Sequence, residues 1–192
     1  ILYPDAEFSK ETDRFSAGAL FYLEILQYFF NMEREILPYD PLYDFGFLID
    51  EEAGKFETYE EYKRLKETFI KEYIYEMMRL NADVTPFRTL EHIAGVHYVA
   101  MTVGRGLWEA GVPIDLALTS GAAAGHDLGK FGCKPNERVP YLHYYYTNQW
   151  FNNHSMEYTG HIAANHSTWD LEPENLSVES LVLIYSDFRV KQ

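Results

Sequence analysis

The segment of residues 113–128 constrains the fold of this chain more than any other part of the sequence. It reads LeuAlaLeuThrSerGlyAlaAlaAlaGly through its centre and stays apolar and small until it reaches His126 and Asp127. A helix that is apolar on all sides lies at the centre of a protein. We therefore expect a central helix whose end places an ionisable pair in the core, where an unpaired carboxylate is very costly.

The remaining sequence is also patterned for helices. Apolar residues recur at three- and four-residue spacing, and Gly, Pro and Asn mark the ends of the segments. No alternating strand pattern is longer than a few residues, so we predict an all-α fold. The other expected helices cover residues 13–37, 59–81, 89–110, 142–150, 156–165 and 177–190. Residues 38–46, the acidic connector 51–58 and residues 129–140 are expected to be loops.

The length and hydrophobic content suit one sizeable core, since the chain has 192 residues of which 47% are hydrophobic. We expect residues 85–192 to form the main domain and residues 1–84 to form an N-terminal helical extension that packs on it. Because the sequence begins at Ile1 without a Met and stops shortly after Asp187, we also expect it to be part of a longer protein. The sequence leaves a homodimer open.

Charge and cysteine content exclude several classes of protein. A formal net charge of -14 repels polyanions, so we expect no broad nucleic-acid binding, and a phosphate substrate would need metal ions to overcome that charge. The apolar runs fall short of the roughly 20 residues of a membrane span, so we expect no membrane segment. The single Cys133 excludes an internal disulfide and a thiolate metal cage, and it favours a cytoplasmic location.

The pair His126-Asp127 has two interpretations when its spacing is taken alone. An imidazole beside a carboxylate suits a borderline or hard divalent cation, and near a helix end both side chains can reach one ion. The alternative is a C-terminal histidine followed by a capping aspartate.

Three segments with ionisable residues follow one another along the chain. They are ArgThrLeuGluHisIleAlaGlyVal at 88–96, HisAspLeuGlyLys at 126–130 and IleTyrSerAspPheArgVal at 184–190. In this order they resemble the HD-domain metal-dependent phosphohydrolases, and the resemblance covers about residues 85–191. It implies an HD-type helical bundle in which one or two divalent ions (Fe, Mn, Mg, Zn, Co or Ni) are bound. The metal ligands that it implies are His92, His126, Asp127 and Asp187.

A second histidine competes with His92 for the place of the first ligand. His97 follows five residues later, which places the two side chains roughly 140° apart around a helix, so one ion cannot easily take both. His92 is preferred because the apolar residues that follow it resemble the stripe that follows the first histidine of the family. His97 is then expected to be an ordinary half-buried histidine.

Members of the family with two metals take two more histidines from the interval before the final aspartate. The resemblance favours His143, which opens a helix, and His166, which closes the next one. His161 lies five residues before His166 and repeats the conflict seen above, while His154 stands in an Asn-rich turn typical of the surface. If only one metal binds, His143 and His166 would instead contact substrate or be structural.

The resemblance also suggests catalytic and substrate-binding roles. Asp127 would help to orient a metal-activated water, and Lys130 would neutralise a phosphate oxygen as charge develops on it. Lys130 could instead only complement the helix dipole. Arg189 and Arg88 are the other candidates for binding phosphate, although they could merely offset local acidity.

Aromatic residues flank the proposed ligands and either stack against a nucleobase or form the core beneath the helices. These residues are Tyr141, Tyr144, Tyr145, Tyr146, Trp150 and Trp169.

The resemblance implies a phosphohydrolase that acts on a nucleotide or another small phosphate ester. The chain lacks the Gly-Tyr-Pro triplet of the branch that hydrolyses cyclic di-GMP. Two other functions stay open at this point: a non-catalytic nucleotide-sensing module of a longer regulatory protein, and a diiron oxygenase, because some HD-fold proteins hold two irons and activate O₂.

Overall fold

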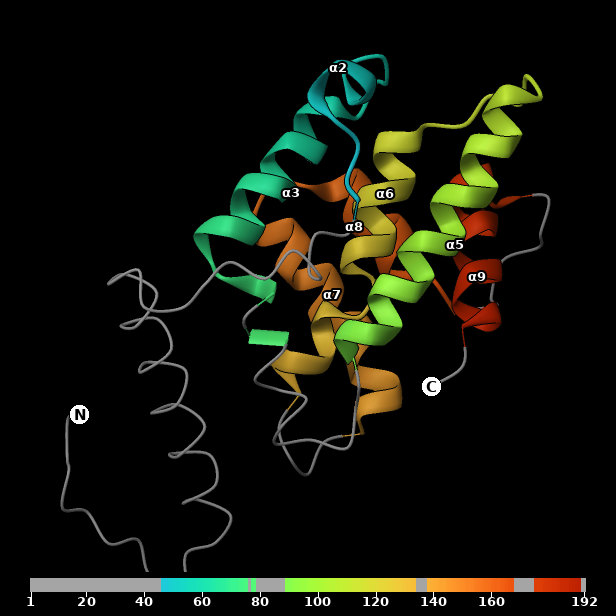
Figure 1. Cartoon of the computed structure of the whole chain (residues 1–192). Coiled ribbons are helices and arrows are strands. Elements are labelled where there is room, and N and C mark those ends of the chain that lie inside the picture. The colour runs from blue at the N-terminus through green and yellow to red at the C-terminus, as the bar shows by residue number, and fades with distance from the viewer. Residues whose placement is uncertain (1–45, 76, 79–88, 134–137, 168–174, 191–192) are drawn as a thin grey trace, which may run out of the picture.

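The protein is a bundle of helices in the computed structural model, which describes residues 46–75, 77–78, 89–133, 138–167 and 175–190. All regular elements in these ranges are helices, which confirms the all-α prediction (Figure 1). They are α2 Asp50–Ala53, α3 Tyr59–Lys71, α5 Thr89–Glu109, α6 Leu116–Gly125, the 3-10 helix η3 Leu128–Gly132, α7 Val139–Asn153, α8 Glu157–Ala164 and α9 Val178–Arg189.

Helix α6 is the centre of the bundle, as its sequence predicts. Every residue of α6 except Leu118 is buried, and the helix packs against α3, α5, α8 and α9 (Figure 1). Its small residues make this possible, because a Cβ added to Gly125 would lie 2.5 Å from the ring of Phe151 on α7. Close approach of the neighbouring helices therefore depends on the small side chains of α6 and on their absence at Gly121 and Gly125.

Carboxylates cap two of the helices around this centre. Asp115 accepts a hydrogen bond from the N–H of Leu118 at 2.8 Å and another from the N–H of Thr58 at 3.1 Å. In the same way, Glu61 of α3 accepts from the N–H of Thr159 in the first turn of α8, at 2.9 Å. A negative charge at a helix N-terminus satisfies free N–H groups and complements the helix dipole, so these contacts stabilise α6 and α8 while fixing α3 against them.

The described part of the expected N-terminal extension shares the core of the rest of the chain. Leu48, Tyr62 and Phe69 are at most 1% exposed and belong to the same hydrophobic cluster as Ile93 and Phe151. Residues 46–78 therefore pack on the helices that follow. The helix expected at 13–37 and nearly all of the loop at 38–46 lie outside the described residues.

Several predicted helix boundaries agree with the structure. The helices expected at 89–110, 156–165 and 177–190 are found to within one residue at each end. Helix α7 is longer than the expected 142–150, because it starts at Val139 with Pro140 in its first turn, where a proline is tolerated.

Other boundaries were predicted wrongly. The single helix expected over 59–81 ends at Lys71, and Tyr73 adopts a positive φ of 53° that breaks it. The supposed loops at 51–58 and 129–140 contain α2 and η3. The central helix stops at Gly125, so His126 and Asp127 lie just beyond its end.

No helix in the described ranges combines the length and the apolar character that a membrane crossing requires.

His97 is fully buried on α5 rather than half-buried as expected. Its Nε2 lies 2.7 Å from the hydroxyl of Ser120 on α6, and its ring meets Phe47 edge-on at 5.7 Å between centroids. Desolvation by burial, assisted by the charge of Arg105, lowers the pKa of His97 to about 4. The ring is therefore neutral in the native state at neutral pH, and it joins α5 to α6 as a structural residue.

We predict that this histidine makes the fold sensitive to mild acid. In the unfolded chain His97 binds a proton near pH 6.5, whereas in the native state it does so only near pH 4. The stability that His97 contributes is therefore fully present above about pH 7, and it is lost as the pH falls from about 6.5 to about 4. At pH 5 the decrease in the free energy of unfolding that is due to His97 is about 2 kcal/mol. His97→Gln, which does not titrate, should lose about 2 kcal/mol less than the parent protein between pH 7 and pH 5. Urea unfolding in the presence of a chelator measures both, and equal losses would contradict the prediction.

Candidate metal centre

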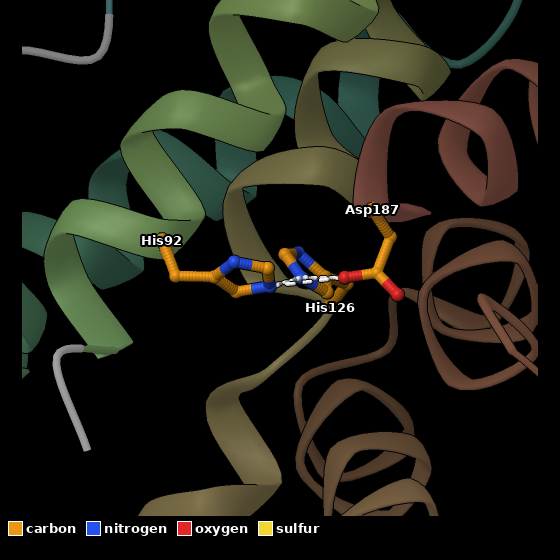
Figure 2. Close-up of side chains that lie close together, drawn as sticks. All are labelled: His92, His126 and Asp187. Carbon is orange, nitrogen blue, oxygen red and sulfur yellow. Dashed lines mark hydrogen bonds and ion pairs between the residues drawn. The ribbon is translucent and has the colours of Figure 1, made fainter. Parts of the chain in front are cut away.

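The structure brings the proposed metal ligands from five elements to one place. Figure 2 shows three of them, with the His92 ring from the first turns of α5 and the Asp187 carboxylate from the last turns of α9 converging on His126 at the end of α6. Asp127 follows His126 directly, His143 lies in α7, and His166 follows the end of α8. All of these side chains except Asp187 are buried, so the groups meet inside the bundle.

The first group consists of His92, His126 and Asp187 (Figure 2). His92 Nε2 lies 2.9 Å from Asp187 Oδ1 and 3.4 Å from His126 Nε2, and His126 Nε2 lies 3.6 Å from the same carboxylate oxygen. One potential ligand atom of each residue lies within 4.8 Å of the others. Two imidazole nitrogens and a carboxylate oxygen at these separations can bind one divalent ion.

A second group forms on the other oxygen of Asp127. Asp127 Oδ2 faces the first group, 3.5 Å from His92 Nε2, whereas Asp127 Oδ1 lies 3.6 Å from His143 Nε2 and 3.7 Å from His166 Nε2. One potential ligand atom each of His126, Asp127 and His166 also lies within 4.8 Å of the other two, so these residues could hold an ion. The carboxylate of Asp127 therefore lies between the two groups and presents one oxygen to each.

The surroundings of Asp127 Oδ1 indicate whether a cation fits between the two groups. This oxygen is buried and accepts no hydrogen bond from any described residue. A buried carboxylate oxygen without a partner is costly, and a metal ion on it would remove the cost. The donor set therefore suits a divalent cation.

Backbone carbonyls orient three of the histidines. The Nδ1–H groups of His126, His143 and His166 point at the carbonyls of Ala123, Val139 and Ala163, at 2.8, 2.6 and 2.6 Å. A ring that donates from Nδ1 in its neutral form carries a free lone pair on Nε2, and all three Nε2 atoms face Asp127. Such second contacts are typical of histidines that bind metals.

Electrostatics in the cluster favour positive charge. Burial alone would raise the pKa of Asp127, but the charges of His126 and Lys130 outweigh it and lower that pKa to about 2. Burial alone would lower the pKa of His126, yet Asp127 and Asp187 raise it. Two ionised carboxylates thus draw a cation to the lone pair of His126, and a proton and a metal ion compete for that position.

Lys130 lies against the cluster, whereas Arg189 points to the surface. Lys130 Nζ donates to Asp127 Oδ2 at 2.6 Å, and its side chain keeps 16% exposure. Arg189 is exposed in the last turn of α9. Arg88 lies outside the described residues. Of the two proposed phosphate-binding residues that the structure describes, Lys130 is therefore the one beside the candidate ligands.

The two alternative histidines take up other positions. His154 Nε2 lies 2.7 Å from Glu72 Oε1 and its Nδ1 donates to the carbonyl of Trp150, so it joins α7 to the end of α3. His161 is exposed on α8. Of these four histidines, the structure therefore places His143 and His166 beside Asp127.

Two residues that support the cluster were missed in the sequence. Thr147 lies one turn after His143 on α7, accepts a hydrogen bond from the N–H of Gly129 at 2.9 Å and donates to the carbonyl of His126 at 3.1 Å. Gly129 is required because an added Cβ would lie only 1.8 Å from the carbonyl oxygen of His143. The spacing of His143 and Thr147 is the one signal that could have pointed to the threonine.

The aromatic residues near the cluster divide between surface and interior. Tyr141 and Tyr145 are 71% and 60% exposed, so they are not part of the core. Trp150 packs against Phe69 and Phe151, while Tyr144 contacts two of the candidate ligands. Trp169 lies outside the described residues.

We predict that Gly129→Ala destabilises the protein by about 1–3 kcal/mol, because α7 must move away from the segment that carries His126 and Asp127. Gly106→Ala is the matched control: Gly106 is exposed in α5 with open space around its Cα, so this change should stabilise by about 0.5–1 kcal/mol. Urea unfolding measures both, and a destabilisation common to the two variants would contradict the packing argument.

Comparisons with known protein families, with curated proteins and with solved structures give no match. The class that the fold and the site define is an all-α protein with buried His/Asp groups that could hold a metal ion.

We predict that divalent ions stabilise the chelator-treated protein. An ion at about 100 times its dissociation constant adds about 2.7 kcal/mol, which corresponds to a rise in Tm of roughly 5–10 °C for a chain of this size. His126→Gln should lose the part of the rise in Tm that the first ion contributes, because the Nε2 atom of His126 is a candidate ligand of the first group. His161→Gln, an exposed histidine on α8, should keep it. Thermal unfolding with Mn, Fe, Co, Ni, Zn and Mg ions checks this, and no shift with any of them would contradict a metal centre.

Proposed function

We propose that this chain is a metal-dependent phosphohydrolase of the HD superfamily. The observation that carries the proposal is the position of Asp127, whose two oxygens face two groups of histidine and carboxylate donors while Lys130 lies on the same carboxylate. The HD order of the segments around His92, His126-Asp127 and Asp187 supports it, because these segments supply the ligands of the first group.

Two ions are proposed. His92, His126 and Asp187 would hold one ion, His143 and His166 would hold the other, and Asp127 would contribute an oxygen to each. Divalent ions in such a site supply Lewis acidity and a water that is deprotonated near neutral pH.

The protein's own groups orient and neutralise the reactants. Asp127 is fixed by the bond from Lys130 and by its burial, so a water held beside it has a defined direction of approach. Lys130 has a partly exposed side chain and can turn its ammonium group toward a phosphoryl oxygen, where it offsets charge that develops during attack. In hydrolysis the water oxygen bonds to phosphorus, the ester oxygen leaves, and a proton passes to that oxygen.

The substrate class follows from charge and access. The chain carries a net charge of -14, so a phosphate must be attracted locally, and the proposed ions together with Lys130 would provide that positive charge. Because the candidate ligands are almost fully buried, we propose a small phosphate ester or a nucleotide as substrate, hydrolysed as a monoester or a diester.

Asp127→Asn tests the proposal. Loss of the carboxylate between the two groups should lower phosphate release by roughly 10²-fold or more in a protein that still folds, because the catalytic groups act together. The assay uses a panel of nucleotides, cyclic nucleotides and small phosphate esters with each divalent ion, and His161→Gln serves as the control with unchanged release.

Two other outcomes would contradict the phosphohydrolase. Iron with uptake of O₂ and no phosphate release from the anaerobically purified protein would indicate the diiron oxygenase. Nucleotide binding that needs no Asp127, without turnover of any substrate, would indicate a sensing module.

A further inference from the structure

Tyr144 lies against both histidines of the second group. Its ring centroid is 3.8 Å from that of His143, with a tilt of 40°, and 4.9 Å from that of His166, with a tilt of 46°. The centroids of the two imidazole rings are 5.4 Å apart, and the phenol ring contacts both of them. One aromatic side chain of α7 therefore touches two candidate ligands that come from different segments.

The hydroxyl of Tyr144 makes a further contact with the same segment. It is hydrogen-bonded to the hydroxyl of Ser167, the residue that follows His166. Tyr144 thus contacts His166 through its ring and the adjacent backbone segment through its hydroxyl.

These contacts matter because His166 lies beyond the end of the helix that precedes it. Helix α8 ends at Ala164, and His166 stands in the turn that follows. Its ring is held by the bond from Nδ1 to the carbonyl of Ala163 and by contacts with the rings of Tyr144 and His126. His143 differs, because it lies within α7 and its ring is held by the carbonyl of Val139 in the preceding turn.

We propose that Tyr144 is a positioning residue for the second metal ion. Its ring keeps the imidazoles of His143 and His166 at the separation at which both Nε2 atoms face Asp127 Oδ1, and its hydroxyl fixes the turn at Ser167. Aromatic contacts and second contacts of this kind orient metal ligands without binding the ion themselves. The inference rests on the two-ion centre of the proposed function and deepens it.

Titration calorimetry of the chelator-treated protein with Mn²⁺ tests this, together with metal analysis after dialysis. The parent protein should bind two ions. Tyr144→Leu should bind the first ion with unchanged affinity and the second about 10-fold or more weakly, since the loss of second contacts costs about that much. Tyr158→Leu, which changes a 72% exposed tyrosine on α8, is the matched control and should bind both ions as the parent does.

A double-mutant cycle on the hydroxyl pair keeps the proposal testable if Tyr144→Leu does not fold, as judged by circular dichroism. Tyr144→Phe and Ser167→Ala should each lower the affinity for the second ion by about 3-fold, and the double variant should bind this ion no more weakly than either single variant. Unchanged affinity for the second ion in all three would overturn the proposal.

The remaining outcomes separate this inference from the proposed function. Two ions bound with parental affinity by a folded Tyr144→Leu would overturn the role of Tyr144 and leave the two-ion phosphohydrolase standing. A parent protein that binds one ion only would overturn both the second site and its positioning residue. Neither outcome depends on finding the substrate.

Discussion

The structure depends on one electrostatic constraint, which is the burial of the Asp127 carboxylate. This side chain is almost inaccessible to water, and a charge in such a position must be compensated. Lys130 compensates the charge on one oxygen, and the charge of His126 lies beside the same oxygen. The other oxygen faces His143 and His166. The residues around this one carboxylate therefore join α5, the end of α6, η3, α7 and the end of α8.

The small residues of α6 make this arrangement geometrically possible. They allow α5, α8 and α9 to approach closely enough for short side chains to meet at the end of α6. The caps at Asp115 and Glu61 hold the N-termini of α6 and α8 against α3, which fixes the direction in which these helices run toward the cluster. Packing therefore determines where the candidate ligands lie, and charge determines what this site can bind.

Much of this could be foreseen from the sequence, because helical periodicity and the order of the ionisable residues are local properties. The angle between positions five residues apart separated His92 from His97, and the structure places them on different faces. The contacts of Tyr144 with His166 and of Thr147 with His126 could not be predicted in this way, because they join segments that are distant in the sequence. The end of α3 at Lys71 was missed for a similar reason, since Glu72 beyond it is drawn to His154 and Trp150 on α7.

The wide spacing of the ligands along the chain has a consequence for synthesis. His92 and Asp187 are 95 positions apart and nevertheless touch, and Asp187 belongs to the last of the described helices. A nascent chain that has not yet released α9 from the ribosome lacks a member of the first group, so it offers an incomplete set of donors. Capture of the first proposed ion would then be deferred until this region has been translated, so its binding would mark a late step of folding rather than guide the early ones.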